Sequence, residues 1–480
     1  MPDPDTHPHG PTVNAGPTCR PRGAAASVGG AHARGPVRWP VVAAVLALVV
    51  GAALRLAPHP SGLWLDELYT AWAADPGAAF VPAFWQRMAP DFQPPGYYPL
   101  MWAWHHLAGS DAAHSRLLGG LAVTAAVPLA AALLRGVLPS RALAAAVAVL
   151  ALAWPGVVFA HEARAYALLY ALACVGYALV LRSTARGPSA SLRLGLCAVA
   201  LGAGAVHYYG MVLGGALLVA QTTASHATRA WRAALPDAAC GAAVAGVYLA
   251  VLVWQAPLQT GDAADWLRND WLRIARGYRE LLAPNDLAAG AVVLLGAAAL
   301  VGRLPARLQG VLAVGIGVSV LVPVLVSLHT PALTARYLII TVPPLALWAG
   351  ARAGTSAGTG RTAAWMLAAA ALAGADARVW TRFKKEEWRA GAALVAAHHR
   401  PGCALPVWHW WPGVYVHYLP AGARAALVTV PTSGPVPAPA PGCAVWLWAG
   451  HPNALTVDPP PGARVVRLYG QEVWLAPSGG

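Results

Sequence analysis

Charged residues are scarce in this chain: they make up 11% of the sequence, and only 19 of the 480 residues are acidic. Hydrophobic residues make up 58%, and the mean hydropathy is +0.52. This composition excludes an ordinary soluble protein and is typical of a polytopic helical membrane protein. The formal net charge of +14 does not indicate nucleic-acid binding, because most arginines lie in short loops between apolar runs, where they set membrane topology.

Cysteine is also rare. The six cysteines include no CxxC pair, which excludes a metal or redox site of that type. Cys174, Cys197 and Cys240 lie inside apolar runs and are interpreted as inert core thiols. Cys403 and Cys443 lie in the last hundred residues and are able to pair if that region is exported.

The first 38 residues almost lack large apolar side chains and are rich in Pro, Gly, Ala, His and Arg. This predicts a disordered cytoplasmic tail over 1–38. The apolar run 39–57 follows directly. No convincing small-residue cleavage site comes after it, so we interpret the run as a retained signal anchor.

Apolar runs of spanning length continue to about residue 380. A further run, 97–108, has about 12 residues, whereas a span requires roughly 20. If 97–108 does not span, all the arginine-rich loops fall on the side of the basic tail, as the positive-inside rule requires. The sequence therefore predicts an all-α polytopic plasma-membrane protein, N-terminus in and C-terminus out, with 97–108 on the outer surface. The eleven predicted spans are 39–57, 117–134, 142–160, 165–181, 194–208, 209–225, 234–254, 287–302, 308–328, 337–351 and 362–379.

This topology collects polar side chains on the outer face and leaves essentially no charge at mid-membrane. The first outer loop, 58–116, carries the adjacent acids Asp66 and Glu67. If their stretch is helical, the two acids project about 100° apart and serve different partners. A solvated helix N-terminus, which favours acids, is the alternative. The other polar candidates on this face are Gln93, His161, Glu162, Arg164, Tyr166, His207, Tyr208, Arg336 and Tyr337.

The composition changes after residue 380. A helix is predicted from about 384 to 399, followed by short strand-like pieces at 404–407, 425–430, 444–448, 464–468 and 473–476. We interpret 381–480 as a small exported α/β domain. The pair Trp388–Arg389 is expected to dock this domain on the membrane.

Three of the outer residues suit one kind of chemistry. An ionised Asp66 is a competent general base for a hydroxyl. Arg164 and Arg336, at the outer ends of spans, suit a phosphate because the guanidinium fork makes bidentate, charge-assisted bonds. The set therefore predicts transfer of a group from a lipid phosphate to a hydroxyl, with the arginines stabilising the departing phosphate.

The order of these motifs resembles the GT-C superfamily of membrane glycosyltransferases. The nearest type is family 39, which includes protein O-mannosyltransferases and the aminoarabinose transferase acting on lipid A. The resemblance covers roughly 39–390. The motifs that carry it are Leu65-Asp66-Glu67, Gln93-Pro94-Pro95 with Tyr97-Tyr98, His161-Glu162-Ala163-Arg164-Ala165-Tyr166, His207-Tyr208, Arg336-Tyr337 and Trp388-Arg389.

The resemblance implies a GT-C transmembrane domain over 39–380, with Asp66 as catalytic base and Glu67 as the neighbour that orders the site. Arg164 matches an arginine that meets the donor phosphate. The implied donor is a polyprenyl-phosphate sugar, the implied acceptor is a hydroxyl on a protein, glycan or lipid, and the anomeric carbon is typically inverted. One departure is Gln93, where the family has His, so the role of that His does not carry over.

Several alternatives remain open at this point. Arg164 and Arg336 also suit helix ends that contact lipid headgroups, and Glu162 is able simply to pair with Arg164. His161, His207, Tyr166, Tyr208 and Tyr337 are candidate phosphate or substrate contacts, or hydrogen-bonding residues at helix ends. A divalent cation held by Asp66, Glu162 and His207 is conceivable, although no ligand spacing demands it. A transporter or lipid flippase is the alternative function, although such proteins tend to place ionisable residues near the midplane. A non-catalytic scaffold whose C-terminal domain binds a partner is a third.

Overall fold

The computed structural model describes residues 39–228, 234–259, 270–355, 358–382, 386–408, 412–430, 436, 438–450 and 458–476. The predicted tail over 1–38 and the start of the helix predicted from 384 lie outside these residues.

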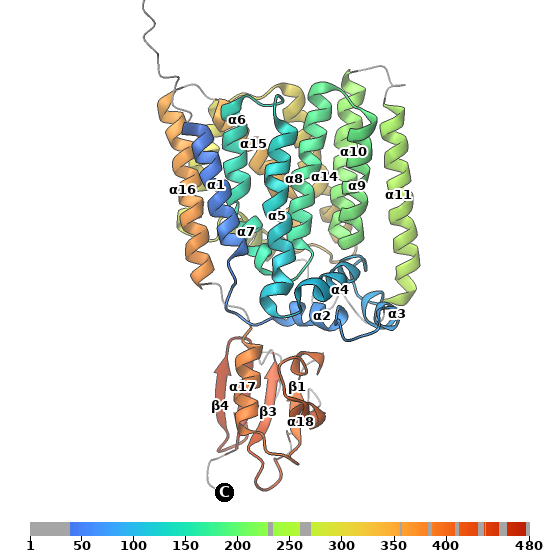
Figure 1. Cartoon of the computed structure of the whole chain (residues 1–480), viewed down its shortest axis with the longest axis vertical. Coiled ribbons are helices and arrows are strands. Elements are labelled where there is room, and N and C mark those ends of the chain that lie inside the picture. The colour runs from blue at the N-terminus through green and yellow to red at the C-terminus, as the bar shows by residue number, and fades with distance from the viewer. Residues whose placement is uncertain are drawn as a thin grey trace, which may run out of the picture. The chain divides into compact units, whose positions relative to one another are not determined.

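Long helices lie side by side in a bundle (Figure 1). Each of the eleven predicted apolar runs contains a helix. Small residues bring α6 and α15 close together: a Cβ added to Gly350 would lie 2.7 Å from Cα of Ala146. The bundle helices are α1 (Trp39–Leu56), α5 (Ala112–Leu134), α6 (Ser140–Leu152), α8 (Tyr166–Arg186), α9 (Ala190–Val206), α10 (Tyr208–Thr228), α11 (Leu235–Gln255), α13 (Asp286–Val301), α14 (Ala306–Ser327), α15 (Val342–Thr355) and α16 (Thr359–Arg382).

Within the described residues, five helical segments are long and apolar enough to cross a membrane, or up to seven if each of two bent pairs counts as one span. The multi-pass character is therefore confirmed, whereas the count of eleven spans is not. One bent pair joins α6 to α7 (Trp154–Val158) and the 3-10 turn η2 (Phe159–His161) at 50°. Pro155 at the start of α7 accounts for the break, because proline cannot continue the α6 hydrogen-bond ladder.

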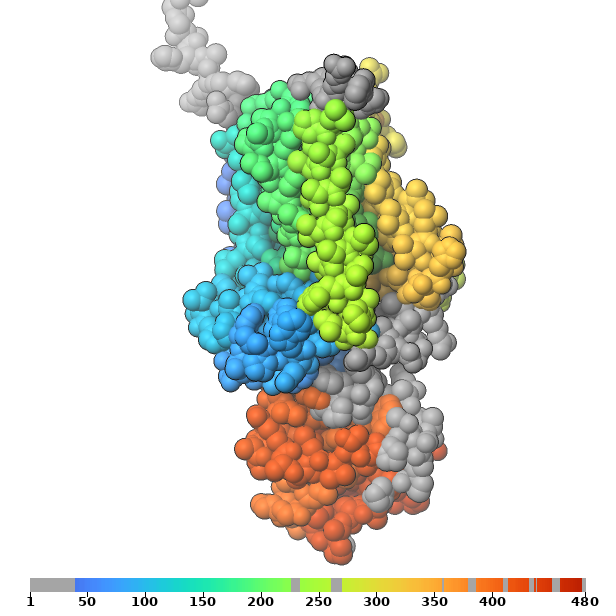
Figure 2. Space-filling model, turned by 90° about the vertical axis from the view of Figure 1, so that its right-hand side faces the viewer, coloured from blue at the N-terminus to red at the C-terminus, as the bar shows by residue number. Residues whose placement is uncertain are grey.

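Helix α11 is the most exposed of these segments. It packs on α9 and α10, and Figure 2 shows it running along the surface of the bundle. Its outer side carries Leu249, Leu252 and Val253, which are 62%, 43% and 67% exposed. Apolar side chains on the outside of a long apolar helix are suited to lipid contact.

The loop 58–116 forms short helices at one end of the bundle (Figure 1). They are α2 (Leu65–Ala73), α3 (Phe80–Ala83), the π-helical turn η1 (Phe84–Met88) and α4 (Tyr97–Ala108). Helix α4 covers the run 97–108, and it buries Tyr97, Tyr98 and Met101.

A second connecting segment follows α11. It holds the 3-10 turn η4 (Ala256–Leu258) and the amphipathic helix α12 (Trp271–Leu282). Helix α12 packs on η5 (Ala335–Thr341), and the hydroxyls of Tyr278 and Thr341 lie 2.6 Å apart. Turn η5 carries Arg336, so α12 supports one wall of the candidate site.

The C-terminal region contains a five-stranded sheet with the order β2-β1-β3-β5-β4. Strand β1 pairs in parallel with β2 and β3, whereas β5 runs antiparallel to β3 and β4. The strands overlap the five predicted strand-like pieces. The elements are α17 (Trp388–His398), β1 (Leu405–Trp408), η6 (Pro412–Tyr415), α18 (Ala421–Ala425), β2 (Leu427–Thr429), β3 (Val445–Gly450), β4 (Arg464–Leu468) and β5 (Gln471–Leu475).

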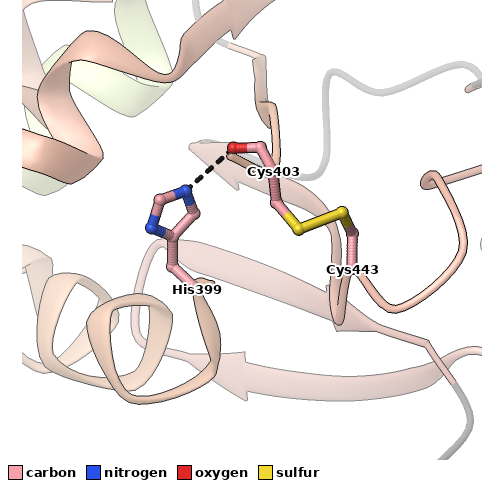
Figure 3. Close-up of a disulfide and its surroundings, with 3 residues drawn as sticks. All are labelled: His399, Cys403 and Cys443. Carbon is pink, nitrogen blue, oxygen red and sulfur yellow. Dashed lines mark hydrogen bonds between the residues drawn. A yellow bond between two sulfur atoms is a disulfide. The ribbon is translucent and has the colours of Figure 1, made fainter. Parts of the chain in front are cut away.

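A disulfide joins Cys403 to Cys443, with 5.6 Å between the two Cα atoms (Figure 3). The pairing considered from the sequence is therefore confirmed. Cys403 precedes β1 and Cys443 precedes β3, so the bond ties together the entries of two paired strands. His399 Nε2 donates to the Cys403 carbonyl at 2.9 Å, which fixes the end of α17 to the same point (Figure 3).

One apolar core is shared between α2 and the C-terminal region. Leu65 and Leu68 of α2 pack in the same cluster as Trp388, Tyr415 and Trp448. Trp388 is fully buried there. The expectation that Trp388, with Arg389, docks the C-terminal region on the membrane is therefore wrong for Trp388, because its ring is buried in the core between α17, the sheet and α2.

Candidate active site

Asp66 lies in the first turn of α2 and faces Arg336 of η5. Arg336 Nη1 donates to Asp66 Oδ2 at 3.0 Å. The Asp66 side chain is 22% exposed and that of Arg336 is 30% exposed, so both groups are reachable from outside the protein. The pair joins residues 270 positions apart and gives a carboxylate and a guanidinium at one surface.

Glu67 points to a different partner, as the helical spacing predicts. Arg116 of α5 binds it with two hydrogen bonds, Nε to Oε1 at 2.8 Å and Nη2 to Oε2 at 2.6 Å. The backbone N–H groups of Ala163 and Trp64 donate to the same carboxylate at 2.8 and 3.1 Å. The side chain of Glu67 is fully buried, so this carboxylate links α2, α5 and the segment around Ala163.

Arg164 lies between α2 and α4. Its Nη1 contacts the Asp66 carbonyl at 3.3 Å, Thr70 Oγ1 at 3.4 Å and Tyr98 Oη at 3.3 Å. Its Nε is buried and has no hydrogen-bond partner among the described residues. Burial alone would lower the pKa of Arg164, but Tyr98 and Asp66 more than compensate and raise it. The guanidinium therefore stays charged and keeps one N–H to offer.

An aromatic cluster extends the site beyond Arg336. The guanidinium carbon of Arg336 lies 5.7 Å from the ring of Tyr166 and 5.5 Å from that of Tyr337, which are cation–π contacts. The ring of His207 lies 5.7 Å from that of Tyr166 and 5.0 Å from that of Tyr337. Four of the residues predicted from the sequence therefore meet beside Asp66.

Two further polar atoms in this cluster have no hydrogen-bond partner in the described part of the chain: Tyr166 Oη and His207 Nε2. Tyr209 N donates to His207 Nδ1 at 3.0 Å. Because Nδ1 accepts, it carries no proton, and the proton of the neutral ring resides on Nε2. Together with Arg164 Nε, the site therefore contains three buried groups with an unused N–H or O–H donor.

Three of the other predicted residues, His161, Tyr208 and Gln93, have hydrogen-bond partners outside the pair of Asp66 and Arg336. His161 Nε2 donates to the Leu54 carbonyl at 2.7 Å, so it fastens η2 to the end of α1. Tyr208 donates to Gln255 Oε1 at 3.0 Å. The backbone carbonyl of Gln93 accepts from Gln255 Nε2 at 2.6 Å. Glu162 is buried, with 7% of its surface exposed.

Asp91 is a site residue that sequence reasoning did not select. Tyr98 donates to its Oδ2 at 2.5 Å, and the same Tyr98 oxygen contacts Arg164. Burial raises the pKa of Asp91, while Arg164 and the Tyr98 hydrogen bond partly oppose the rise. The signal was available, because Asp91 stands two residues before Gln93 in the turn that carries part of the resemblance.

The described residues do not fit a metal site. No group of three or more His, Cys, Asp or Glu side chains in that part of the chain could hold an ion. Of the three candidate ligands, Asp66 is engaged by Arg336, and His207 presents a protonated Nε2 that cannot ligate.

Comparison with solved structures identifies the fold. The chain superimposes on the GT-C glycosyltransferase ArnT from Cupriavidus metallidurans bound to undecaprenyl phosphate with a TM-score of 0.58, at 15% identity, over 91% of this chain and 98% of that chain. This chain has the GT-C fold. The mycobacterial arabinofuranosyltransferase AftD gives a TM-score of 0.51 at 15% identity over 92% of this chain and 40% of that chain. No family model and no curated protein sequence matches this chain. The predicted GT-C fold class is thus confirmed, together with a small C-terminal sheet.

Proposed function

We propose that this protein is an integral membrane glycosyltransferase that moves a sugar from a polyprenyl-phosphate donor to a hydroxyl acceptor, with Asp66 as general base. The observation that carries the proposal is the pairing of Asp66 and Arg336 beside buried groups with unused donors. A carboxylate suits the acceptor proton, and the donors suit a phosphate.

The donor phosphate fits the cluster around Arg336. Arg164 Nε, Tyr166 Oη and His207 Nε2 each leave a buried polar group unpaired within the described chain, which costs free energy unless a ligand satisfies it. All three are able to donate, and phosphate oxygens accept. Two guanidinium groups add the positive charge that a leaving phosphate requires. The GT-C neighbour ArnT was solved with undecaprenyl phosphate, which has this chemistry.

In the proposed reaction, Asp66 takes the proton of the acceptor hydroxyl as its oxygen attacks the anomeric carbon. The bond between that carbon and the phosphate oxygen breaks, and its electron pair leaves with the polyprenyl phosphate. Arg164 and Arg336 stabilise the negative charge that develops on the departing phosphate. Attack from the side opposite the phosphate would invert the anomeric carbon, as the family resemblance implies.

Glu67 holds the base in place in this proposal. Its carboxylate oxygens receive four hydrogen bonds from described residues, two of them from Arg116, so it has little capacity left for substrate. Gln93, Glu162, Tyr208 and Tyr337 are proposed to border the acceptor and sugar.

The proposed location is the extracytoplasmic face of the plasma membrane. Disulfides persist in oxidising compartments, which supports export of the region holding Cys403 and Cys443. The arginine-rich loops belong to the opposite, cytoplasmic end. The acceptor is proposed to be a protein, glycan or lipid hydroxyl exposed outside the cell.

The test is a screen of the purified protein against polyprenyl-phosphate sugars, which measures donor consumption and product formation. Wild-type protein is expected to consume at least one donor. Asp66→Asn is expected to lower kcat by about 10²–10⁴-fold, the contribution of a general base, while the protein still folds. Full activity of Asp66→Asn, or donor flux across proteoliposomes without transfer, would overturn the proposal.

A further inference from the structure

Three successive backbone N–H groups lead into Asp66, and each has a side-chain acceptor. Leu63 N donates to Tyr418 Oη at 2.6 Å, Trp64 N to Glu67 Oε2 at 3.1 Å, and Leu65 N to Glu386 Oε2 at 3.1 Å. Two of the three acceptors come from the C-terminal region, 355 and 321 positions later in the chain. The start of the helix that carries the candidate base is therefore completed by distant residues.

Trp64 is the N-cap and Leu65 the first residue of α2, and the first N–H groups of a helix have no backbone partner within the helix. Leu63 is fully buried and Leu65 is 9% exposed, so bulk water is a poor substitute. A carboxylate at this end also interacts favourably with the helix dipole. Glu386 thus caps α2 at the residue immediately before Asp66.

Glu386 is held rigidly where it caps α2. Trp388 Nε1 donates to the same Oε2 at 2.6 Å. Gly470 packs against it so closely that an added Cβ would lie 2.7 Å from Glu386 Cγ. Gly470 also has φ of 77°, a conformation that favours glycine. The carboxylate therefore has a fixed place between the sheet and α2.

Tyr418 contacts the same segment at Gly62 and Leu63. An added Cβ on Gly62 would lie 3.0 Å from Tyr418 Oη, so the backbone passes directly beneath the hydroxyl. From the membrane side, Arg116 donates to the carbonyls of Ser61 and Gly62 at 3.0 and 2.8 Å. The segment before Asp66 is therefore held through two of its carbonyls by α5 and through two of its amides by the C-terminal region.

We propose that Glu386 and Tyr418 are positioning residues for Asp66, and that the C-terminal region is a structural part of the active site. This inference rests on the proposed function. Loss of either acceptor would let the start of α2 move relative to Arg336. A displacement of about 1 Å in such a geometry is enough to cost up to about 10²-fold in rate.

The test compares four variants of the full-length protein in lipid nanodiscs: Glu386→Ala, Glu386→Gln, Tyr418→Phe and the control Glu387→Ala. Glu387 is the adjacent carboxylate, but its Oε2 accepts from Tyr469 N inside the C-terminal region. The first measurement is hydrogen–deuterium exchange of the peptide spanning 61–68. The second is kcat and donor KM for the sugar donor that the wild-type protein consumes.

Glu386→Ala and Tyr418→Phe are expected to increase deuterium uptake in 61–68 and to lower kcat about 10-fold, with donor KM within about twofold of wild type. Glu386→Gln is expected to recover most of both values, because its amide oxygen still accepts from Leu65 N. Glu387→Ala is expected to match wild type in both.

Three results would overturn the inference. The first is deuterium uptake in 61–68 that stays at the wild-type level in both Glu386→Ala and Tyr418→Phe. The second is a fall in kcat in Glu387→Ala as large as that in Glu386→Ala. The third is a fall in kcat that comes with a lower unfolding temperature and a raised donor KM, which a general folding defect would cause. If the wild-type protein transfers no sugar, the proposed function fails, while the exchange measurement still decides whether these residues hold the segment.

Discussion

The surroundings of Asp66 and Glu67 differ although the two carboxylates are neighbours in the chain. Around Glu67, the oxygens receive four hydrogen bonds, and the side chain is fully buried with Arg116. Around Asp66, one hydrogen bond from Arg336 is described, and about a fifth of the side chain is exposed. Three nearby donors have no hydrogen-bond partner among the residues that the structure describes. A saturated carboxylate stabilises the fold, whereas a partly used one at a surface is available for chemistry.

The largest expected effect is a loss of stability when the buried carboxylate of Glu67 is changed. Glu67→Gln removes the charge opposite Arg116 in a site with almost no solvent, and breaking a buried ion pair costs about 3–5 kcal/mol. The measurement is the unfolding temperature in detergent. Asp66→Asn is the matched control and is expected to change stability by no more than about 1 kcal/mol, because its pair is partly exposed. Equal losses in the two variants would remove the distinction.

A smaller effect, on the KM for the donor, is expected when His207 in the cluster beside Asp66 is changed. His207→Phe keeps the ring against Tyr337 but removes the unused Nε2–H. A hydrogen bond to a charged group is worth about 1.5–3 kcal/mol, so donor KM should rise by about 10-fold or more. The measurement is the KM for the donor that the screen identifies.

The matched control for His207 is His161→Gln. Because His161 already donates to the Leu54 carbonyl, its replacement is expected to leave donor KM unchanged and to lower stability slightly. A larger rise in KM for His161→Gln than for His207→Phe would show that the donor lies at η2 instead.

The smallest expected effect concerns pH and Asp91. Burial raises the folded-state pKa of Asp91 above its ordinary value of 3.8, so the folded state binds the proton more tightly than the unfolded state. Stability associated with this group is therefore present at low pH and is lost as the pH rises through the raised pKa. Asp91→Asn lacks this loss. The difference in unfolding temperature between Asp91→Asn and wild type is therefore expected to increase from pH 4 to pH 8. A difference that does not change with pH would contradict the raised pKa of Asp91.

Local sequence and membrane topology were enough to predict much of the candidate site. Asp66, Arg164, His207 and Arg336 each follow or precede an apolar run, so counting spans places them at one membrane surface. The structure brings them together at the same end of the bundle.

Other features could not be predicted because they depend on contacts between residues distant in sequence. The bond between Arg116 and Glu67 joins residues 49 positions apart, and that between Leu65 and Glu386 joins residues 321 apart. An arginine near the start of a span has the same local pattern whether it faces lipid headgroups or a buried acid. Trp388 was misplaced for the same reason, since a tryptophan suits an interface and a core equally well.

The long separation between Leu65 and Glu386 has a consequence for biosynthesis. A ribosome delivers Asp66 to the membrane early, but the acceptor for the amide beside it is translated only after the last bundle helix. Until then the nascent chain lacks the cap on α2. On the proposal made here, the growing polypeptide stays inactive toward lipid-linked sugars until nearly the whole protein has been made and translocated.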